Sequence, residues 1–569
     1  MGDILFLFVR RLRAPLITVI LVYAISVLGL TLIPGKDGNG NVVAMGFFHA
    51  FYVMSYTATT IGFGEIPYAF TDAQRLWVTI CIYFSVIGWA YTFGSVLAIA
   101  NDPTFQSMLA RSLFMWRVKG MREPFYIVCG YGQSGAAIAK ALDRVGARLV
   151  VIENRAERAA LVAVEPFENP PLVLCADARI ASALEDAGIQ RPECRALLAL
   201  AGDDAVNQAI AIGAKVLSPE LLTVARTKAP VAKANLQAFG GITVINPFET
   251  FATNLALDLQ APAVLQLEEW LTAANGTECP PSIDLPRGNW VLVGYGRFGQ
   301  AIGHILDAAG IGWKTFDPKI YLEHEARLLH GEYTEQLLIE AGIQEADVLV
   351  AGTDVDAVNL GVITLARRVN PDIFVVIRQN HVHDSMLVDA AKAQVKFVQA
   401  ELMLHECLQI LNTPMLARLI THIRVHHSAL ANPVLQTILA RLGSQSPQAW
   451  EFDCDLLQPG LFSAFFQNPG HPPLLEHLCV DPQFGGGALA ALPIALERQG
   501  LLTVLPQAGT LLLAGDKLLF VGDLRAMQVQ QRFAAESGLL AAICSGQEPP
   551  RSSVFRWLAK RGWYQVARR

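Results

Sequence analysis

The chain has 569 residues, of which 53% are hydrophobic and only 17% are charged. Soluble proteins carry about 25% charged residues, so this composition excludes a disordered, fibrous or nucleic-acid-coating protein. The formal net charge of −6 gives no general attraction to polyanions, and we expect no nucleic-acid partner. The nine cysteines are scattered without a C-x-x-C, which indicates neither a zinc site nor a disulfide framework.

Two charge-free runs, residues 14–33 and 76–100, are long enough to cross a membrane. Twenty helical residues span about 30 Å, the thickness of the hydrocarbon layer. The two runs favour membrane helices at 14–33 and 74–100 over buried soluble helices, and the first lacks a signal-peptide cleavage site. Basic residues precede the first run and follow the second, which predicts that these two ends are both cytoplasmic. They are Arg10, Arg11 and Arg13 before the first run, and Arg111, Arg117, Lys119 and Arg122 after the second.

A short apolar segment lies between the two runs. Residues 46–59 are aromatic but too few to span, which predicts a re-entrant pore helix. The next residues, 60–65, are Thr60, Ile61, Gly62, Phe63, Gly64 and Glu65. Alternate glycines admit backbone conformations closed to other residues, so that successive carbonyls can point the same way. The carbonyl oxygens of four such segments around one axis would replace the water shell of a potassium ion. The alternative interpretation of the segment is a Gly-rich turn in a helical hairpin.

The membrane domain, residues 1–101, is followed by a linker at 102–122 and then by a dinucleotide-binding fingerprint. An apolar strand leads into G-x-G-x-x-G, and a later strand ends in an acid 18 residues after the third glycine. In such a fingerprint the glycines let a pyrophosphate approach a helix N-terminus, and the acid accepts hydrogen bonds from ribose hydroxyls. The residues are Gly130, Gly132, Gly135 and Glu153, and the unit recurs 164 residues later as Gly294, Gly296, Gly299 and Asp317.

Later landmarks also repeat, at an offset of 152 residues. Asp204 and Asn207 recur as Asp356 and Asn359. The fold class that we predict is a helical two-span pore followed by two Rossmann-like α/β domains of about six β-α repeats each, at 123–288 and 289–540. The second includes a small β-rich lobe, in which 511–522 is predicted to form a hairpin around Gly-Asp, and a basic tail follows at 541–569.

These motifs carry a resemblance to a known family. Residues 14–100 resemble the pore of two-transmembrane potassium channels, whose filter T-V-G-Y-G-D is here T-I-G-F-G-E. Phe63 lacks the tyrosine hydroxyl that often braces the filter, whereas Glu65 keeps the external carboxylate. Two Rossmann copies behind such a pore resemble the RCK (regulator of potassium conductance) channels, whose domains belong with the TrkA-type potassium-transport domains. Two copies in one chain narrow the resemblance to tandem-RCK prokaryotic channels of the multi-ligand-gated GsuK type.

The resemblance implies an assembly and its ligands. It implies a multi-pass homotetramer in the lipid of the inner (plasma) membrane, with eight RCK domains in a cytoplasmic gating ring. The strand-end acids favour NAD or an adenine nucleotide over NADP as the regulatory ligand. Arg297 matches the G-x-G-R-x-G of TrkA-type nucleotide binders, whereas the first copy has Gln133 at this position. Asp177 lies where the family often places a further ligand contact.

Divalent metal, with calcium as the candidate, is the other ligand that the resemblance implies. Carboxylates near strand ends bind it in relatives, and calcium prefers six to eight oxygens. One sequence does not identify a site shared between subunits, and solvated loop carboxylates are the alternative interpretation. The candidates are Asp203, Asp204, Glu332, Asp354, Asp356 and the cluster of His381, His383 and Asp384.

The second span offers a candidate gate. Gly88 lies midway along it, where a missing Cβ permits bending. Phe93 and Leu97 are four residues apart and share one helix face. If this face lines the pore, four copies form an apolar constriction that closes by dewetting. The alternative is that the face packs against the outer helix or lipid.

The function predicted from the sequence is a potassium-selective channel gated by cytosolic ligands, a nucleotide or a divalent cation or both. A weakly selective cation channel with the same gating ring is the first alternative. A membrane-anchored NAD-dependent oxidoreductase is the second, but it would need a substrate domain with a general acid or base. No such domain or catalytic motif is evident in the sequence, so we do not expect an enzyme.

Overall fold

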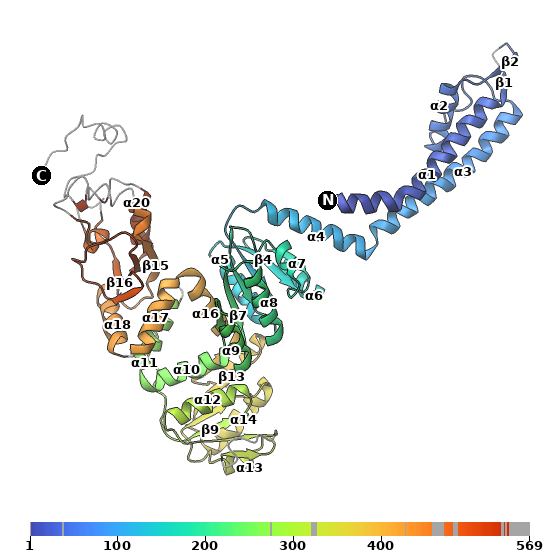
Figure 1. The fold of residues 1–569 in the computed structure, drawn as a ribbon. Helices are drawn as coiled ribbons and strands as arrows, with labels where there is room; N and C mark the ends of the chain where they lie inside the picture. The colour runs from blue at the N-terminus through green and yellow to red at the C-terminus, as the bar shows by residue number, and fades with distance from the viewer. Residues whose placement is uncertain are drawn as a thin grey trace, which may run out of the picture. The chain divides into compact units, whose positions relative to one another are not determined.

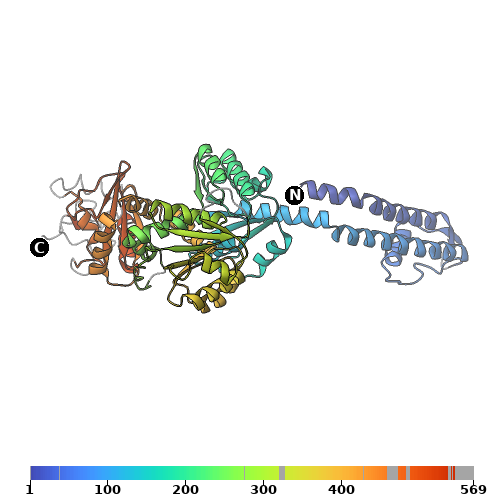
Figure 2. The ribbon, with the colours of Figure 1, turned by 90° about the horizontal axis from the view of Figure 1, so that it is seen from below.

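A computed structural model describes residues 2–36, 39–273, 276–319, 327–426, 428–457, 472–481, 487–535, 540 and 543–544. The chain divides into two compact units, Met1–Met121 and Arg122–Arg569. The first unit is mainly helical, and the second contains the two six-stranded sheets and a four-stranded sheet (Figures 1 and 2).

The N-terminal unit is built from two long helices and a short one. Helices α1 (Gly2–Leu32) and α3 (Asp72–Ala100) run side by side, and α2 (Phe47–Ala58) packs against both (Figure 1). The core between them contains Leu30, Met54 and Cys81. Two stretches, Leu12–Leu32 and Asp72–Ala100, are long and apolar enough to cross a membrane. A two-stranded ribbon, β1 (Pro34–Lys36) and β2 (Val42–Ala44), joins α1 to α2.

The N-terminal unit differs from the expected boundaries in two places. Helix α1 begins at Gly2, well before the apolar run at 14–33, because residues 2–13 hold no helix-breaking glycine or proline after Gly2. The linker expected at 102–122 forms an 18-residue helix, α4 (Pro103–Gly120). Asp102 caps it by accepting a hydrogen bond from the Thr104 amide at 2.8 Å, and Pro103 occupies the first helical turn.

The first half of the C-terminal unit is a six-stranded parallel sheet of order β5-β4-β3-β6-β7-β8, flanked by helices (Figure 1). Its strands are β3 (Phe125–Cys129), β4 (Arg148–Glu153), β5 (Leu172–Cys175), β6 (Cys194–Ala199), β7 (Leu222–Arg226) and β8 (Ile242–Ile245). Its helices are α5 (Gln133–Arg144), α6 (Ala156–Val164), α7 (Ala181–Asp186), α8 (Asp204–Leu217), α9 (Pro230–Phe239) and α10 (Pro247–Gln260).

The second half repeats this topology, with strand order β11-β10-β9-β12-β13-β14. The strands are β9 (Trp290–Val293), β10 (Trp313–Asp317), β11 (Leu328–His330), β12 (Val348–Ala351), β13 (Phe374–Gln379) and β14 (Val395–Val398). The helices are α12 (Arg297–Ala308), α13 (Glu335–Glu340), α14 (Asp356–Val369), the 3-10 helix η1 (Val382–Asp384), α15 (Ser385–Ala390) and α16 (Gln399–Asn412). The prediction of two Rossmann-like copies is confirmed.

The two copies exchange their last helices. Helix α10 follows β8 of the first copy but packs on α12 of the second, where Phe251 stacks on Phe298 with ring centroids 5.5 Å apart. Helix α16 follows β14 of the second copy but packs on α5 of the first, where Met403 and Cys407 are buried in the same core as Leu142. Each sheet therefore has its core completed by a helix of the other copy.

The C-terminal lobe is an antiparallel sheet of order β15-β18-β16-β17 packed on helices. Its elements are α11 (Pro262–Thr272), α17 (Pro414–His426), α18 (Ser428–Leu442), β15 (Gln448–Asp453), η2 (Cys454–Leu457), η3 (Leu475–Cys479), β16 (Ala491–Arg498), β17 (Leu501–Val504), β18 (Lys517–Gly522) and α20 (Leu524–Ala535). The β-rich lobe is thus confirmed. The tail at 541–569 lies outside the described residues, apart from 543 and 544.

The hairpin predicted for 511–522 is wrong. The lobe's hairpin joins β16 to β17 around Gln499 and Gly500, both of which have positive φ, whereas β18 pairs with β15 and β16. Gly-Asp forms only a turn before β18, because Asp516 accepts hydrogen bonds from the Leu513 amide at 2.8 Å and from the Arg498 side chain at 2.7–2.8 Å. Local turn chemistry alone did not reveal which strands pair.

Candidate functional site

The segment between α2 and α3 has an alternating backbone. Thr60, Gly62 and Gly64 have φ values of +62°, +68° and +92°, and Ile61 and Phe63 lie between them. Left-handed conformations at alternate residues turn successive carbonyls toward the same side, as a carbonyl-lined ion site requires. The amides of Ile61 and Gly62 both donate to the Tyr56 carbonyl, at 2.9 and 3.3 Å, so the C-terminal end of α2 anchors the segment.

Helix α2 braces the segment through two tyrosines that are not among the residues predicted from the sequence. The hydroxyl of Tyr56 donates a hydrogen bond to the carbonyl oxygen of Gly64. The ring of Phe63 stacks on Tyr52, with centroids 6.3 Å apart and planes 11° apart, and meets Tyr56 edge-on at 5.5 Å. A hydroxyl from α2 therefore reaches the segment whose own Phe63 has none. The four-residue spacing of Tyr52 and Tyr56 is the sequence signal that places both on one helix face.

The Glu65 end of the segment is held by an ion pair. Glu65 accepts hydrogen bonds from the Arg75 guanidinium at 2.8 and 3.2 Å, and from the Phe70 amide at 2.8 Å. Bidentate pairs of this kind fix geometry as well as charge. Glu65 thus ties the loop that follows the segment to the first turn of α3.

The candidate gate residues divide between two faces of α3, which is one continuous helix. Gly88 faces α1: a Cβ there would lie 3.9 Å from the Val19 side chain. Phe93 and Leu97 are 65% and 46% exposed, on the side turned away from α1. Their facing a pore remains a prediction, as does bending at Gly88.

Both glycine turns have the geometry of the fingerprint. Gly130 and Gly294, the first glycines, have φ of +96° and +89°. A Cβ on Gly135 would lie 2.0 Å from the Gly130 carbonyl oxygen, and a Cβ on Gly299 would lie 2.2 Å from that of Gly294. No other residue fits at the third position, because it would collide with backbone. The second glycines, Gly132 and Gly296, directly precede α5 and α12.

The strand-end acids brace these turns in the same way. Glu153 accepts a hydrogen bond from the Tyr131 amide at 2.6 Å, and Asp317 accepts one from the Tyr295 amide at 2.7 Å. The second oxygen of each acid accepts from the backbone two residues later, at 3.0 and 2.8 Å. Both side chains are buried. Each carboxylate oxygen has a further lone pair, so contact with ribose hydroxyls remains a prediction.

Arg297 lies at the junction of the two copies. Its guanidinium, 56% exposed, is 3.6 Å from a carboxylate oxygen of Asp204, the first residue of α8 in the first copy. Lys228 shares this cationic junction. Burial, together with Arg226, Arg378 and Arg297, lowers the pKa of Lys228 to about 8 against the opposing effect of Asp204. The sequence analysis did not bring Arg297 and Asp204 together.

Asp177 is occupied by a neighbouring arginine. Its carboxylate binds the Arg179 guanidinium, with the closest atoms 2.6 Å apart, and accepts from the Arg179 amide at 2.9 Å. The side-chain hydrogen bonds from Arg179 hold the pKa of Asp177 below its ordinary value. A ligand contact by Asp177 would have to share this ion pair.

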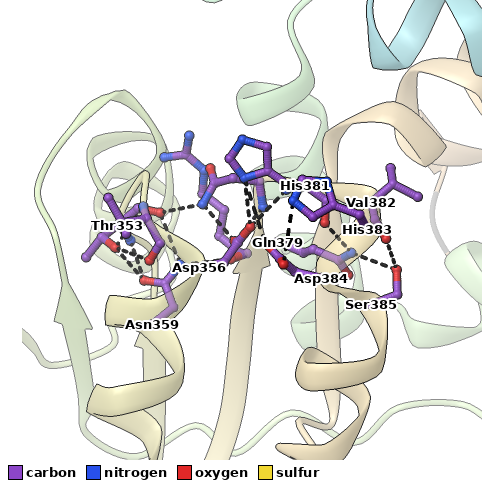
Figure 3. A network of polar contacts seen from close by, with 12 residues as sticks. Thr353, Asp356, Asn359, Gln379, His381, Val382, His383, Asp384 and Ser385 are labelled. Carbon is purple, nitrogen blue, oxygen red and sulfur yellow. Dashed lines mark hydrogen bonds and ion pairs between the residues drawn. The ribbon is translucent and has the colours of Figure 1, made fainter.

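The candidate metal residues separate into a scattered group and a cluster. Asp203 caps α8 through the Ala205 amide at 2.8 Å, while Glu332 and Asp354 are exposed. Within the described parts of the chain, Asp356, His381 and Asp384 come together, with one ligand atom of each within 4.8 Å of the others (Figure 3). Burial alone would raise the pKa of Asp356, but hydrogen bonds from Asn380 and His381 outweigh it and lower the pKa.

Comparison with known proteins identifies the two sheets. The TrkA-N domain model matches residues 126–247 and 290–398, which cover the two six-stranded copies. The two sheets thus resemble TrkA-N domains, and two membrane-length helices precede them in the chain.

Similar sequences include prokaryotic proteins named as potassium channels. Potassium channel protein 1 of Methanocaldococcus jannaschii is 26% identical over 269 residues, 47% of this chain and 75% of the relative. The voltage-gated potassium channel Kch of Escherichia coli is 31% identical over 180 residues, 31% of this chain and 40% of Kch. The solved GsuK channel covers 94% of this chain and 100% of its own, at 14% identity and a TM-score of 0.48. GsuK has also been solved bound to ADP, at 18% identity and a TM-score of 0.45; that structure covers 72% of this chain and 99% of its own. The structure bound to NAD is 15% identical, with a TM-score of 0.46, and covers 94% of this chain and 100% of its own.

Proposed function

We propose that the chain is the subunit of a potassium-selective channel. The observation that supports this most directly is the alternating left-handed backbone at Thr60, Gly62 and Gly64, held between α2 and α3. In a homotetramer, four copies of the segment would supply stacked carbonyl rings from Ile61 to Phe63, with the Thr60 hydroxyl as the innermost ring. The potassium-channel names of the relatives agree with this function, which is transport rather than catalysis.

The membrane topology and assembly belong to the same proposal. The basic flanks of the two spans favour a cytoplasmic location for the TrkA-N domains beneath the plasma membrane. Four chains would bring eight such domains into a gating ring. Helix α4 follows α3 directly in the chain, so a change in ring geometry would reach the inner helix through it. Moving a gate from 1:99 to 99:1 takes about 5.5 kcal/mol, which several sites coupled by about 1–3 kcal/mol each can supply.

NAD or an adenine nucleotide is the regulatory ligand in this proposal. The residues fit such a group because the space beside Gly296 is open. Apart from its chain neighbours, no described atom lies within 4 Å of the position that a Cβ on Gly296 would take, so a ligand can approach the backbone at the N-terminus of α12. The turn Gly294–Gly299 would hold a pyrophosphate against that helix end. Asp317 would receive the ribose hydroxyls, and an acid there disfavours the 2′-phosphate of NADP.

Ion flux from the purified protein in liposomes tests the proposal. Vesicles with a potassium gradient should take up a tracer cation, vesicles with the equivalent sodium gradient should not, and NAD or ADP should change the potassium rate. Equal flux under both gradients would instead support the weakly selective channel. Flux of neither ion, together with hydride transfer to or from NAD, would support the oxidoreductase.

A further inference from the structure

The turn after β13 brings together side chains of the types that serve as metal ligands. Asp356 is the first residue of α14, and His381 and Asp384 belong to the turn around η1 (Figure 3). The Nδ1 atom of His381 lies 3.2 Å from Oδ2 of Asp356 and 3.9 Å from Oδ2 of Asp384. Nitrogen and oxygen donors thus converge from two elements that are 25 residues apart in sequence.

The spacing of these atoms suits a small dication. Ligand atoms bound tetrahedrally at about 2.0–2.1 Å from zinc lie about 3.4 Å from one another. The two His381 distances lie on either side of this value. His383 stands beside the group: its Nε2 is 3.7 Å from Oδ1 of Asp384, and its ring centroid is 5.1 Å from that of His381. It provides a fourth donor at the rim.

The turn is held in place by the protein itself. The buried Gln379 donates to the His381 carbonyl at 2.8 Å and to the Ser385 hydroxyl at 2.9 Å. Asp356 accepts from the backbone amides of Asn380 and His381 at 2.7 and 2.9 Å. The ligand backbone is therefore positioned before any ion binds, which reduces the cost of ordering a site.

The first copy shows which of these residues the turn needs. Asp204 occupies the position of Asp356 and accepts from the Lys228 amide at 3.0 Å, as Asp356 accepts from the Asn380 amide. The aspartate therefore serves the fold in both copies. The positions of His381, His383 and Asp384, however, are Ala229, Val231 and Ala232 in the first copy. The turn forms without imidazoles or a second carboxylate, so the three donors of the second copy have a role beyond holding the turn.

We propose that Asp356, His381 and Asp384 form a binding site for a transition-metal dication of the Zn²⁺ class, with His383 as a further ligand. Imidazole with carboxylate suits zinc and its neighbours, whereas calcium requires six to eight oxygens. His381 and Asp384 are 50% and 26% exposed, so an ion reaches them from solvent. The site extends the proposed function and holds whether or not the chain conducts potassium.

Zinc titration of the full-length protein in detergent, stripped beforehand with a chelator, tests the site. The first variant replaces the turn with that of the first copy: His381→Ala, His383→Val and Asp384→Ala. The matched control is His422→Ala with His426→Ala, a pair on α17 with ring centroids 4.5 Å apart that belongs to no three-ligand group among the described residues. The wild type should bind one more Zn²⁺ per chain than the turn variant. The same difference should be found when both proteins also carry His422→Ala and His426→Ala.

Single substitutions of similar size guard against misfolding. His381→Gln and Asp384→Asn should each weaken zinc binding at least about tenfold, since even indirect loss of ligand support has that effect. The same zinc stoichiometry and affinity in the wild type, turn variant and single variants would overturn the site. If the wild type instead bound calcium at a site that the turn variant lacks, the assignment to a metal of the Zn²⁺ class would be overturned. Neither readout depends on ion flux, so failure here is distinct from failure of the channel function.

Discussion

The Tyr56 hydroxyl donates a hydrogen bond to the Gly64 carbonyl oxygen, so α2 braces the segment 60–65 that follows it. Tyr56→Phe removes this bond and keeps the ring contact with Phe63. A hydrogen bond contributes about 1 kcal/mol, so the potassium-to-sodium permeability ratio should fall about fivefold in bilayer recordings. Tyr52→Phe is the control, because its ring stacks on Phe63 but its hydroxyl has no partner among the described residues. An equal loss in both variants would contradict the bracing role.

Gly62→Ala should abolish potassium-selective conduction. The described structure leaves space around a Cβ at Gly62, so the effect comes from its φ of +68°, which costs an L-residue about 1–2 kcal/mol and turns the carbonyl. Gly40→Ala imposes similar strain, at φ +84° and with equal space, outside the filter segment. Reversal potentials under potassium and sodium gradients should shift for Gly62→Ala alone. A selective Gly62→Ala channel would show that this backbone does not determine selectivity.

Leu97→Asn should raise the open fraction without ligand. If Leu97 faces the pore, four polar side chains would wet the apolar constriction that closes the channel. Leu76→Asn provides a control at an exposed leucine near the other end of α3. Single-channel recordings should show at least a severalfold rise for Leu97→Asn and little change for Leu76→Asn. An unchanged open probability would contradict the pore-lining assignment and indicate that Leu97 faces lipid.

The second copy should be the stronger nucleotide site. Charge-assisted hydrogen bonds from Arg297 contribute about 1.5–3 kcal/mol, so Arg297→Ala should weaken NAD or ADP binding by about one to two orders of magnitude. Gln133→Ala, at the same position of the first copy, should have little effect, and NADP should not bind. Titration calorimetry measures each affinity. Equal losses from both variants, or none from Arg297→Ala, would contradict the assignment.

The contact between Arg297 and Asp204 provides a second test of the same site. Asp204 competes with a phosphate for the guanidinium, from which its nearer oxygen is 3.6 Å. Asp204→Asn keeps a similar side-chain shape and removes the competing charge. It should therefore tighten nucleotide binding in calorimetry, whereas weaker binding would indicate that Asp204 positions Arg297.

Local sequence patterns predicted where helices and strands form better than which other elements they pack against. The positions of Gly130, Gly135 and Glu153 follow from one strand-turn-helix unit, which needs no information from the rest of the chain. The exchange of α10 and α16 could not be predicted in this way, because an apolar helix face shows that it is buried but not against which copy. The contact of Arg297 with Asp204 depends on that exchange and was missed with it.

The cluster at Asp356 was partly predictable. The sequence places His381, His383 and Asp384 in one cluster among the eight candidates, but it gives no reason to join Asp356 to them. The 152-residue offset would have revealed that the second copy has His381, His383 and Asp384 where the first has small apolar residues. The distances between these side chains still required the fold, since Asp356 lies on a different element from the others.

Glu406 should make the stability of the C-terminal unit depend on pH. Burial, with Glu268, raises the pKa of Glu406 to about 7, against the opposing effect of Arg424. The folded state therefore binds more protons than the unfolded state between the ordinary glutamate pKa and about 7. Stability contributed by the protonated form is lost as pH rises through this window. Glu406→Gln should accordingly raise the melting temperature more at pH 8 than at pH 5. Glu401→Gln, an exposed position on the same helix, is the control and should change little at either pH. The same gain at both pH values would contradict a buried, protonated Glu406.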